Sequence, residues 1–347
     1  MHVFLLQKAK SFLSQNTLAA ILGLGFALRL GFVLSSSHMY YADEVFQVLE
    51  PAHTFAFGYG IIPWEYEDGV RNWILPFFYG LLLKFFSFLG LTQPAYYSLG
   101  VNIVTSSLSL SLIWAVFHIS KTYFKDKKLA IVSALVVATW YEFIYFAPRP
   151  FFEVIATYLA YVGFALSLVF ISPFVQFSSG FLLGLTFLIR PQYIPFVLVL
   201  LFLSYNQQKQ KKEFLLHALG GTLAGIATGG VADWIAWGTL FNTFKTYLFH
   251  NLARGSELVI DAGNLGQQVR LFYAYALLIT SGGIVLLSVR LLKKYWLLWL
   301  AIATIFLPHT IVDHKEYRFI FIILPLLLML SLKSLDEILK ERKMSIQ

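Results

Sequence analysis

Long apolar runs fill most of this 347-residue chain, and only short charged islands interrupt them. Inside a bilayer the backbone must satisfy its own hydrogen bonds, so a crossing segment folds as a helix of about 20 mainly apolar residues. Hydrophobic residues make up 58% of the chain and charged residues 13%, whereas a soluble domain is about one quarter charged. The sequence therefore predicts an all-α polytopic membrane protein and excludes a soluble domain.

Ten segments are apolar enough to cross a membrane, since helices within a bundle can be shorter than isolated spans. We expect these spans near Leu18–Leu34, Tyr97–Ser120, Leu129–Phe146, Phe152–Ile171, Phe177–Ile189, Tyr193–Tyr205, Phe214–Trp237, Leu271–Val289, Tyr295–Leu307 and Phe319–Leu332. Trp73–Gly90 is also apolar, but one more crossing would move the basic run Lys121–Lys128 to the other side. We therefore expect Trp73–Gly90 to be membrane-embedded or re-entrant, in a bundle of about 10–11 transmembrane helices.

Basic residues gather in five islands between the expected spans. These islands are Lys8–Lys10, Lys121–Lys128, Lys209–Lys212, Arg290–Lys294 and Lys333–Lys343. Cytoplasmic loops are enriched in Lys and Arg, and ten crossings place all five islands and both termini on that side. Membrane topology thus explains the net charge of +8, which does not indicate a nucleic-acid partner. The chain has no cysteine, which excludes disulfides, thiolate metal sites and a cysteine nucleophile.

The expected outer loop at residues 35–72 is strongly acidic, and Arg71 is its single arginine. Its acidic residues are Asp43, Glu44, Glu50, Glu65, Glu67 and Asp68, one third of the 18 in the chain. The loop also contains Tyr and Trp residues, which favour the headgroup level of a membrane. We expect a structured loop at the membrane surface, with an interfacial helix over Asp43–Phe57.

The other segments on the expected outer side are rich in cations, histidine and proline. They are Pro148–Glu153, Arg190–Gln192, Trp237–Arg270 and Pro308–Arg318. Pro191 should break a helix at membrane depth, which is tolerated only where the freed backbone faces protein or a water-filled cavity. Carboxylates and cations can therefore meet in one aqueous pocket. A lipid-linked phosphosugar suits such a pocket, because its phosphate needs cationic donors and the acceptor hydroxyl needs a carboxylate base.

Two short motifs carry most of the candidate chemistry, and each has a structural alternative. Asp43 and Glu44 can simply cap an interfacial helix, since acidic residues stabilise helix N-termini. Snorkelling and a local ion pair explain Lys315 within His314–Phe319, but they do not explain a whole cation cluster on the outer side. We therefore interpret His314, Lys315 and Arg318 as a phosphate-binding group.

Single ionisable residues near the outer ends of the spans are further candidates. Arg190, inside an apolar stretch, is the strongest of them, whereas snorkelling or capping of helix carbonyls explains Arg149 equally well. Asp233 is an intramembrane carboxylate, for which a function and a buried hydrogen bond are equal contenders. His250 gives a weak signal. No metal-binding spacing occurs, so we expect neither a metal ion nor another cofactor.

Five blocks of the chain, taken in order, resemble glycosyltransferase family 22. The blocks are Ala42–His53, Pro63–Pro76, Leu188–Gln192, Asp233–Asn251 and His314–Phe319. The last block, HKEYRF, is the most specific of the five. The family includes the eukaryotic α-mannosyltransferases that extend lipid-linked N-glycan precursors and GPI anchors.

The resemblance implies a single GT-C-type domain over residues 1–347, with an acidic loop at 35–72 and a cationic loop at 308–318 on the outer face. It implies inverting transfer of a sugar, mannose by the family pattern, from a polyprenyl-phosphate donor to a glycan or glycolipid hydroxyl, with formation of an α-linkage. Asp43 would be the general base, Glu44 would position it or hold the acceptor, and Arg190 would support the phosphate-binding group. Substrate-binding roles are implied for Trp64, Glu65, Arg71, Gln192, Asp233, His250 and Glu316.

Two other classes of protein share some of these features. A transporter or flippase of a lipid-linked sugar would have the same bundle, but its site residues usually lie near the bilayer midplane between related halves. A membrane scaffold without chemistry leaves the acidic loop and the HKEYRF block unexplained. The lack of both cysteine and Asn-x-Ser/Thr glycosylation sites favours a bacterial inner membrane over the endoplasmic reticulum.

Overall fold

The computed structural model describes residues 16–36, 41–253, 271–311 and 315–346, and no β-strand occurs within these ranges. The first elements are α2 (Thr17–Ser35), α3 (Ala42–Glu44), the π-helix η1 (Val45–Leu49), α4 (Glu50–Phe57), α5 (Trp64–Glu67), α6 (Ile74–Phe88), α7 (Pro94–Tyr123), α8 (Lys127–Thr139), α9 (Tyr141–Phe146) and α10 (Phe152–Val169). The later elements are α11 (Pro173–Ile189), η2 (Pro191–Tyr193), α12 (Ile194–Gln207), α13 (Lys211–Trp237), α14 (Asn242–Ala253), α17 (Phe272–Thr280), η3 (Ile284–Leu291), α18 (Trp296–Ile311), η4 (Tyr317–Ile323) and α19 (Leu324–Ile346). The predicted all-α fold is confirmed.

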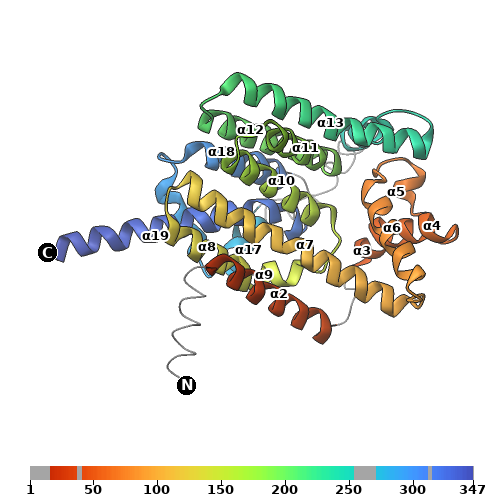
Figure 1. Ribbon diagram of the computed structural model, residues 1–347, viewed down its shortest axis with the longest axis horizontal. Helices are drawn as coiled ribbons and strands as arrows, with labels where there is room; N and C mark the ends of the chain where they lie inside the picture. Colours follow the sequence, from red (N-terminus) through yellow and green to blue (C-terminus); the bar gives the residue numbers. More distant parts are fainter. Residues whose placement is uncertain (1–15, 37–40, 254–270, 312–314, 347) are drawn as a thin grey trace.

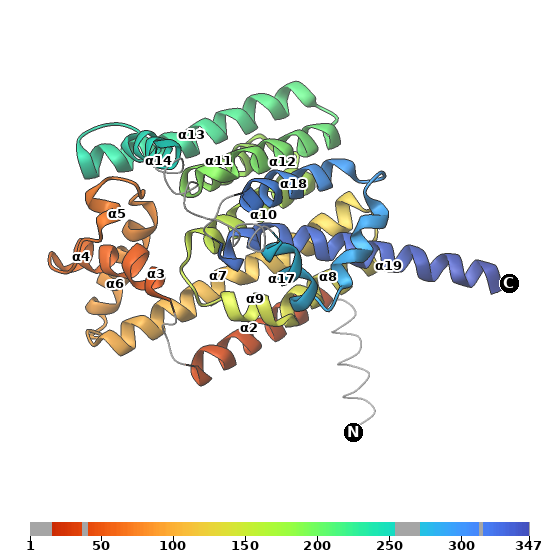
Figure 2. The same cartoon turned by 180° about the vertical axis from the view of Figure 1, so that it is seen from behind.

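The long helices run back and forth between two ends of a bundle (Figures 1 and 2). Helices α3 to α6 gather at one end, which we call the loop end. The last turns of α19 project from the opposite end, which we call the C-terminal end. The acidic first loop and the C-terminus therefore lie at opposite ends of the molecule.

Three of the predicted basic islands meet at the C-terminal end. Arg290, in the last turn of η3, pairs with Glu341 of α19 at 2.5 Å. Lys340 lies 3.7 Å from Asp126, which precedes α8. Exposed pairs of this kind contribute little to stability, so their importance is positional. They place basic islands together and away from the acidic loop, as the predicted topology requires.

Among the described residues, five helical runs are long and apolar enough to cross a membrane, namely α2, α7, α10, α13 and the run of η4 with α19. Helices α6, α11 and α18 are shorter apolar helices. The predicted span Leu271–Val289 is not one continuous helix, because α17 and η3 meet at an angle of 111°. Gly282 and Gly283 form this bend with φ values of 58° and 80°, which glycine adopts without a steric penalty. The predicted span Leu129–Phe146 is also interrupted, at Trp140 between α8 and α9.

Helices α11 and α13 approach each other at backbone contact through glycine. A Cβ added to Gly180 would lie 1.9 Å from the carbonyl oxygen of Ala218, and one added to Gly221 would lie 1.9 Å from that of Phe177. Small residues allow such close approach in membranes, where packing rather than the hydrophobic effect joins helices. This contact fixes α11, at whose end Arg190 lies.

Gly221→Ala is expected to destabilise the bundle by about 1–3 kcal/mol, the usual cost of overpacking a tight contact. The control is Gly220→Ala on the same helix, where an added Cβ would lie 3.9 Å from the Phe177 ring, in ordinary contact. Thermal unfolding of the two purified variants in detergent measures the difference. Equal unfolding midpoints would contradict the backbone contact.

Arg29 is completely buried within α2. Its guanidinium donates to Ser109 Oγ at 2.7 Å and to the carbonyl oxygens of Val137 at 3.1 Å and Ala138 at 3.0 Å. The last carbonyls of a helix have no partner within it, and these two belong to the last turn of α8. Arg29 therefore stabilises the break at Trp140, from which α9 leads to the loop end.

Helix α6 is the 15-residue helix formed by the segment predicted to be embedded or re-entrant. It lies at the loop end beside α4 (Figures 1 and 2). A Cβ on Gly80 would lie 2.9 Å from the carbonyl oxygen of Ala52, so the two helices are in close contact. The Tyr79 hydroxyl lies 2.9 Å from Thr105 Oγ1 of α7. These contacts join the first loop to the bundle.

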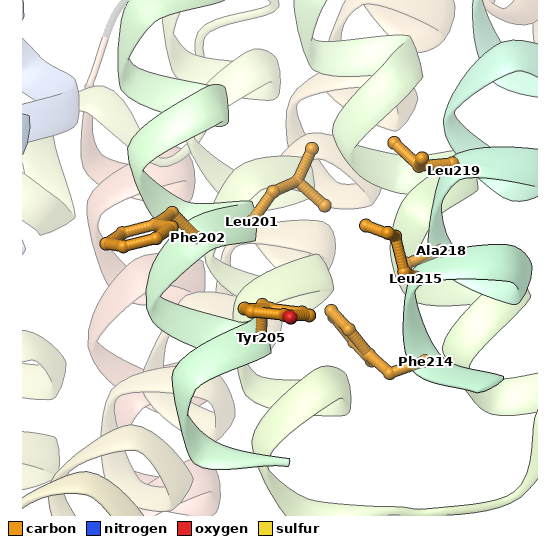
Figure 3. Close-up of a pocket in the computed structure, with 7 residues that line it drawn as sticks. All are labelled: Leu201, Phe202, Tyr205, Phe214, Leu215, Ala218 and Leu219. Atoms are coloured by element: carbon orange, nitrogen blue, oxygen red, sulfur yellow. The ribbon is translucent and has the colours of Figure 1, made fainter. Parts of the chain in front are cut away.

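An apolar hollow of about 230 Å³ separates α12 from the start of α13 (Figure 3). It is lined by Leu201, Phe202, Tyr205, Phe214, Leu215, Ala218 and Leu219. The basic island Lys209–Lys212 lies in and next to the turn between the two helices. The residues that line the hollow are therefore distant in sequence from the acidic loop at residues 35–72. Its lining suits hydrocarbon chains and offers no group for chemistry, so we do not place the substrate there.

Candidate active site

The first loop contains one helical run from Ala42 to Phe57. Asp43 and Glu44 lie on its first turn, α3, and the π-helix η1 follows directly. π-Helical turns are rare and frequently occur at functional sites. The run ends at Gly58, whose φ of 79° is the usual left-handed conformation of a helix C-cap. The helix predicted over this segment is confirmed.

Asp43 forms an ion pair with Arg318, which lies 275 residues further along the chain in η4. Arg318 Nη2 donates to Oδ2 of Asp43, and Oε2 of Glu316 lies 2.7 Å from Nε of the same guanidinium. The guanidinium carbon is 4.4 Å from the centre of the Phe151 ring. The Arg318 side chain is 5% exposed and that of Asp43 is 33% exposed. The acidic loop and the HKEYRF block therefore meet, as predicted.

Glu44 forms a buried ion pair with Arg149. Arg149 Nη1 lies 2.5 Å from Glu44 Oε1, and neither side chain reaches solvent appreciably. Arg149 Nε also donates to the carbonyl oxygen of Tyr145 at 3.1 Å, and its guanidinium lies over the Tyr145 and Tyr41 rings at 4.2 and 5.4 Å. Snorkelling therefore does not describe Arg149, which is the counter-ion of Glu44.

Arg190 forms a second buried ion pair, with Glu153 in the first turn of α10. It lies at the predicted break between α11 and Pro191. The guanidinium carbons of Arg190 and Arg318 are each 5.6 Å from the centre of the Phe319 ring. Within the described part of the chain, Arg190 Nε and Arg318 Nη1 are buried without an acceptor. Two arginines with spare N–H donors thus lie against one aromatic ring.

Arg71 and Glu65 form a third pair at the loop end. Arg71 donates to Glu65 Oε1 from Nη2 at 2.9 Å and from Nε at 3.1 Å, and the Gln47 amide approaches the same oxygen at 3.4 Å. Burial alone would lower the pKa of Arg71, but Glu65, Tyr247 and Tyr66 together outweigh burial and raise it. Burial raises the pKa of Tyr66 well above its usual value, and its hydroxyl donates to the Gln47 carbonyl at 2.5 Å. The exposed Trp64 is the first residue of α5, the short helix that also contains Glu65 and Tyr66.

Helix α9 supports the segment that carries Arg318. The Tyr317 hydroxyl donates to Glu142 Oε1 at 2.6 Å, and the Tyr141 hydroxyl donates to the same oxygen at 3.2 Å. Thr280 Oγ1 of α17 lies 3.0 Å from the Tyr317 hydroxyl. These hydroxyls replace the solvation that the buried Glu142 carboxylate has lost. Because Tyr317 precedes Arg318, the network fixes the guanidinium that meets Asp43.

Lys315 has a structural role in this conformation. Its ammonium donates to the carbonyl oxygens of His309 at 2.9 Å and Thr310 at 3.1 Å, near the end of α18. Cations stabilise the carbonyl end of a helix, so capping explains this position. His314 lies outside the described residues, as does the side chain of His250.

Asp233 joins α13 to α14 and to the segment before α6. Its Oδ1 accepts hydrogen bonds from Asn72 Nδ2 and Thr243 Oγ1, both at 2.7 Å, and its Oδ2 accepts one from the Thr243 N–H at 2.8 Å. These donors satisfy the carboxylate, which favours the buried hydrogen bond over the predicted substrate contact. Gln192 Oε1 accepts a hydrogen bond from the Tyr247 hydroxyl at 2.7 Å.

Sequence reasoning missed Glu153 and Glu142 as partners and underestimated Arg149. Each of the two carboxylates lies in an apolar stretch, which is a signal in itself because charge is costly at membrane depth. The described residues contain no group of three His, Asp or Glu side chains able to hold a metal ion. The site can take up a proton through a carboxylate and stabilise an adjacent anion through arginine N–H donors.

Arg149→Leu is expected to destabilise the protein by about 3–5 kcal/mol, because Glu44 would remain buried without its counter-ion. The double variant Glu44→Leu and Arg149→Leu should recover much of this loss, since an apolar pair often replaces a buried ion pair at little cost. Thermal unfolding in detergent compares the two variants. A double variant as unstable as the single one would show that the pair does not account for the loss.

The fold and site define a polytopic membrane protein in which ion pairs join an acidic first loop to a helical bundle. The model of the Alg9-like mannosyltransferase family matches residues 20–347. The chain belongs to this family, which confirms the resemblance to glycosyltransferase family 22.

Three curated relatives of this chain come from eukaryotes. GPI mannosyltransferase 3 of Debaryomyces hansenii is 28% identical over 341 residues, which cover 90% of this chain and 58% of the relative. GPI alpha-1,2-mannosyltransferase 3 of Xenopus laevis is 25% identical over 331 residues, with coverage of 90% and 58%. GPI mannosyltransferase 3 of Drosophila melanogaster is 27% identical over 323 residues, with coverage of 87% and 54%. The chain thus spans little more than half the length of these relatives, and no solved structure matches it.

Proposed function

We propose that this chain is an inverting mannosyltransferase that moves mannose from a polyprenyl-phosphate donor to a hydroxyl of a glycan or glycolipid acceptor, with formation of an α-linkage. The observation that carries the proposal is the pair of Asp43 and Arg318, which joins a candidate base to a candidate phosphate ligand. Family membership supports mannosyl transfer. The names of the relatives favour an acceptor of the GPI glycolipid type.

In this mechanism Asp43 takes the proton of the acceptor hydroxyl. The hydroxyl oxygen bonds to the anomeric carbon on the face opposite the phosphate, and the bond between that carbon and the phosphate oxygen breaks. Polyprenyl phosphate leaves, and a β-linked donor gives an α-linked product. Asp43 is the partly exposed member of the acidic pair, whereas Glu44 is buried against Arg149 and positions the helix.

The leaving phosphate gains negative charge as the glycosidic bond breaks. Preorganised donors aimed at developing charge lower the barrier more than they aid ground-state binding. Arg318 and Arg190 supply such donors, because Nη1 of the first and Nε of the second have no acceptor among the described residues. We expect no metal requirement, since these arginines provide the positive charge.

The lipid part of the donor needs an apolar surface beside the arginines. A hollow of about 170 Å³ adjoins Pro191, the residue after Arg190. It is lined by Phe187, Leu188, Pro191, Ile226, Phe241, Thr243 and Phe244. This volume suits the first isoprene units of a polyprenyl chain. We propose that the site lies on the outer or lumenal face of the membrane.

The test is an assay of the purified full-length protein in nanodiscs with radiolabelled polyprenyl-phosphate mannose and mannosylated GPI-type glycolipid acceptors. Transfer of label to an acceptor is the expected result. A parallel assay in sealed vesicles measures movement of the donor across the bilayer. Translocation without transfer would support a flippase and contradict the proposal.

A further inference from the structure

We propose that Arg318 is a shared ligand, which holds the Asp43 carboxylate in the donor-free protein and exchanges it for the donor phosphate. Donor binding would then release the base, so that acceptor activation follows donor binding. The inference rests on the proposed function, because it assigns a phosphate-bearing donor to this site.

The geometry of the guanidinium carries the proposal. Arginine binds phosphate best through two parallel N–H donors of its planar fork. One edge of the Arg318 fork is made by Nη1, which has no acceptor among the described residues, and Nη2, which donates to Asp43. Glu316 Oε2 lies 2.7 Å from Nε as an ion-pair partner, although the Nε N–H makes no hydrogen bond within the described residues. Nη2 has two N–H groups, and a phosphate that binds Nη1 together with the N–H that now meets Asp43 displaces this carboxylate, while Glu316 can remain as a counter-ion.

The surroundings keep Arg318 in place during this exchange. The Phe151 ring lies 4.4 Å from the guanidinium carbon, and the side chain is 5% exposed. Tyr317, the preceding residue, is tied to Glu142. By contrast, Asp43 is 33% exposed and lies on the short helix α3, so the carboxylate is the partner that can move.

The exchange also couples donor binding to activation of the acceptor hydroxyl. In the donor-free protein Arg318 neutralises the Asp43 carboxylate and occupies Oδ2, one of its two proton acceptors. A bound phosphate would take over the arginine and leave an unpaired carboxylate beside the anomeric carbon. Arg190, whose guanidinium carbon also lies 5.6 Å from the centre of the Phe319 ring, would offer a further donor to the same phosphate.

The experiment measures equilibrium binding of radiolabelled polyprenyl phosphate, which carries no sugar, to the full-length protein in nanodiscs. Asp43→Asn should tighten binding by about threefold to tenfold, because the phosphate no longer competes with a carboxylate. Arg318→Gln should weaken binding by about tenfold or more. In the Arg318→Gln background, Asp43→Asn should give no gain, since no arginine remains to be released.

The control is Glu67→Gln, which removes the same charge from an exposed position in the same loop and should change affinity by less than about twofold. An equal gain from Asp43→Asn in both backgrounds would overturn the exchange, because it would show simple repulsion between Asp43 and the phosphate. Weaker binding by Asp43→Asn would also overturn it. Failure of the wild-type protein to bind polyprenyl phosphate would instead contradict the proposed function itself.

Discussion

Replacement of Asp43 by asparagine is expected to abolish mannosyl transfer, with kcat lowered by at least about a hundredfold, as for the loss of a general base. The amide has nearly the same size as the carboxylate but cannot take up the acceptor proton. Arg318 keeps Glu316 as a second carboxylate, so the loop end should stay folded. The measurement is kcat at saturating donor and acceptor, together with the thermal unfolding midpoint in detergent.

Glu67→Gln is the matched control for the loss of charge, and its turnover should stay close to that of the wild-type protein. Glu67 is exposed on α5, two residues beyond Glu65. Near-wild-type turnover of the Asp43 variant would exclude this residue as the base. An unfolded Asp43 variant would contradict the view that Glu316 suffices to hold Arg318.

Replacement of Arg318 by glutamine is expected to lower kcat by about 10²–10³-fold, the usual cost of removing one donor to developing negative charge. Donor affinity should also fall, but the loss in kcat should be larger because the hydrogen bonds strengthen as the phosphate gains charge. Arg318→Lys should recover only part of the rate, since an ammonium keeps the charge without the planar fork.

The control for the Arg318 variant is Arg290→Gln at the C-terminal end. Arg290 also pairs with a glutamate, but the pair is exposed and lies away from the acidic loop, so activity should not change. Separate determination of kcat and KM for the donor shows whether Arg318 binds the transition state more strongly than the ground state. A higher KM with unchanged kcat would mean that Arg318 binds ground state and transition state equally.

The scarcity of charge made part of the site predictable. An ionisable side chain at membrane depth costs free energy, so the few that occur near the ends of the spans are expected to have a functional or a structural role. This argument, with the family blocks, identified Asp43 and Arg318, which the structure places in contact across 275 residues of chain. It also predicted the broken helix at Pro191.

The partners of the buried charges could not be predicted in the same way. The pairs of Glu44 with Arg149 and of Glu153 with Arg190 each join a helix to a link between helices, and the packing of the bundle rather than local sequence decides which residues meet. Local sequence also could not distinguish capping from phosphate binding for Lys315, because both need the same cation. The bend between α17 and η3 did have a sequence signal, the adjacent glycines Gly282 and Gly283.

The anomeric configuration of the product tests the central claim most directly. The wild-type protein is incubated with a β-linked, radiolabelled polyprenyl-phosphate mannose and an acceptor glycolipid, and the product is digested with an α-specific mannosidase. Asp43 should activate the acceptor on the face opposite the phosphate, so the account predicts an α-mannoside from which the enzyme releases the label. A product that resists the α-mannosidase but yields to a β-mannosidase would contradict it.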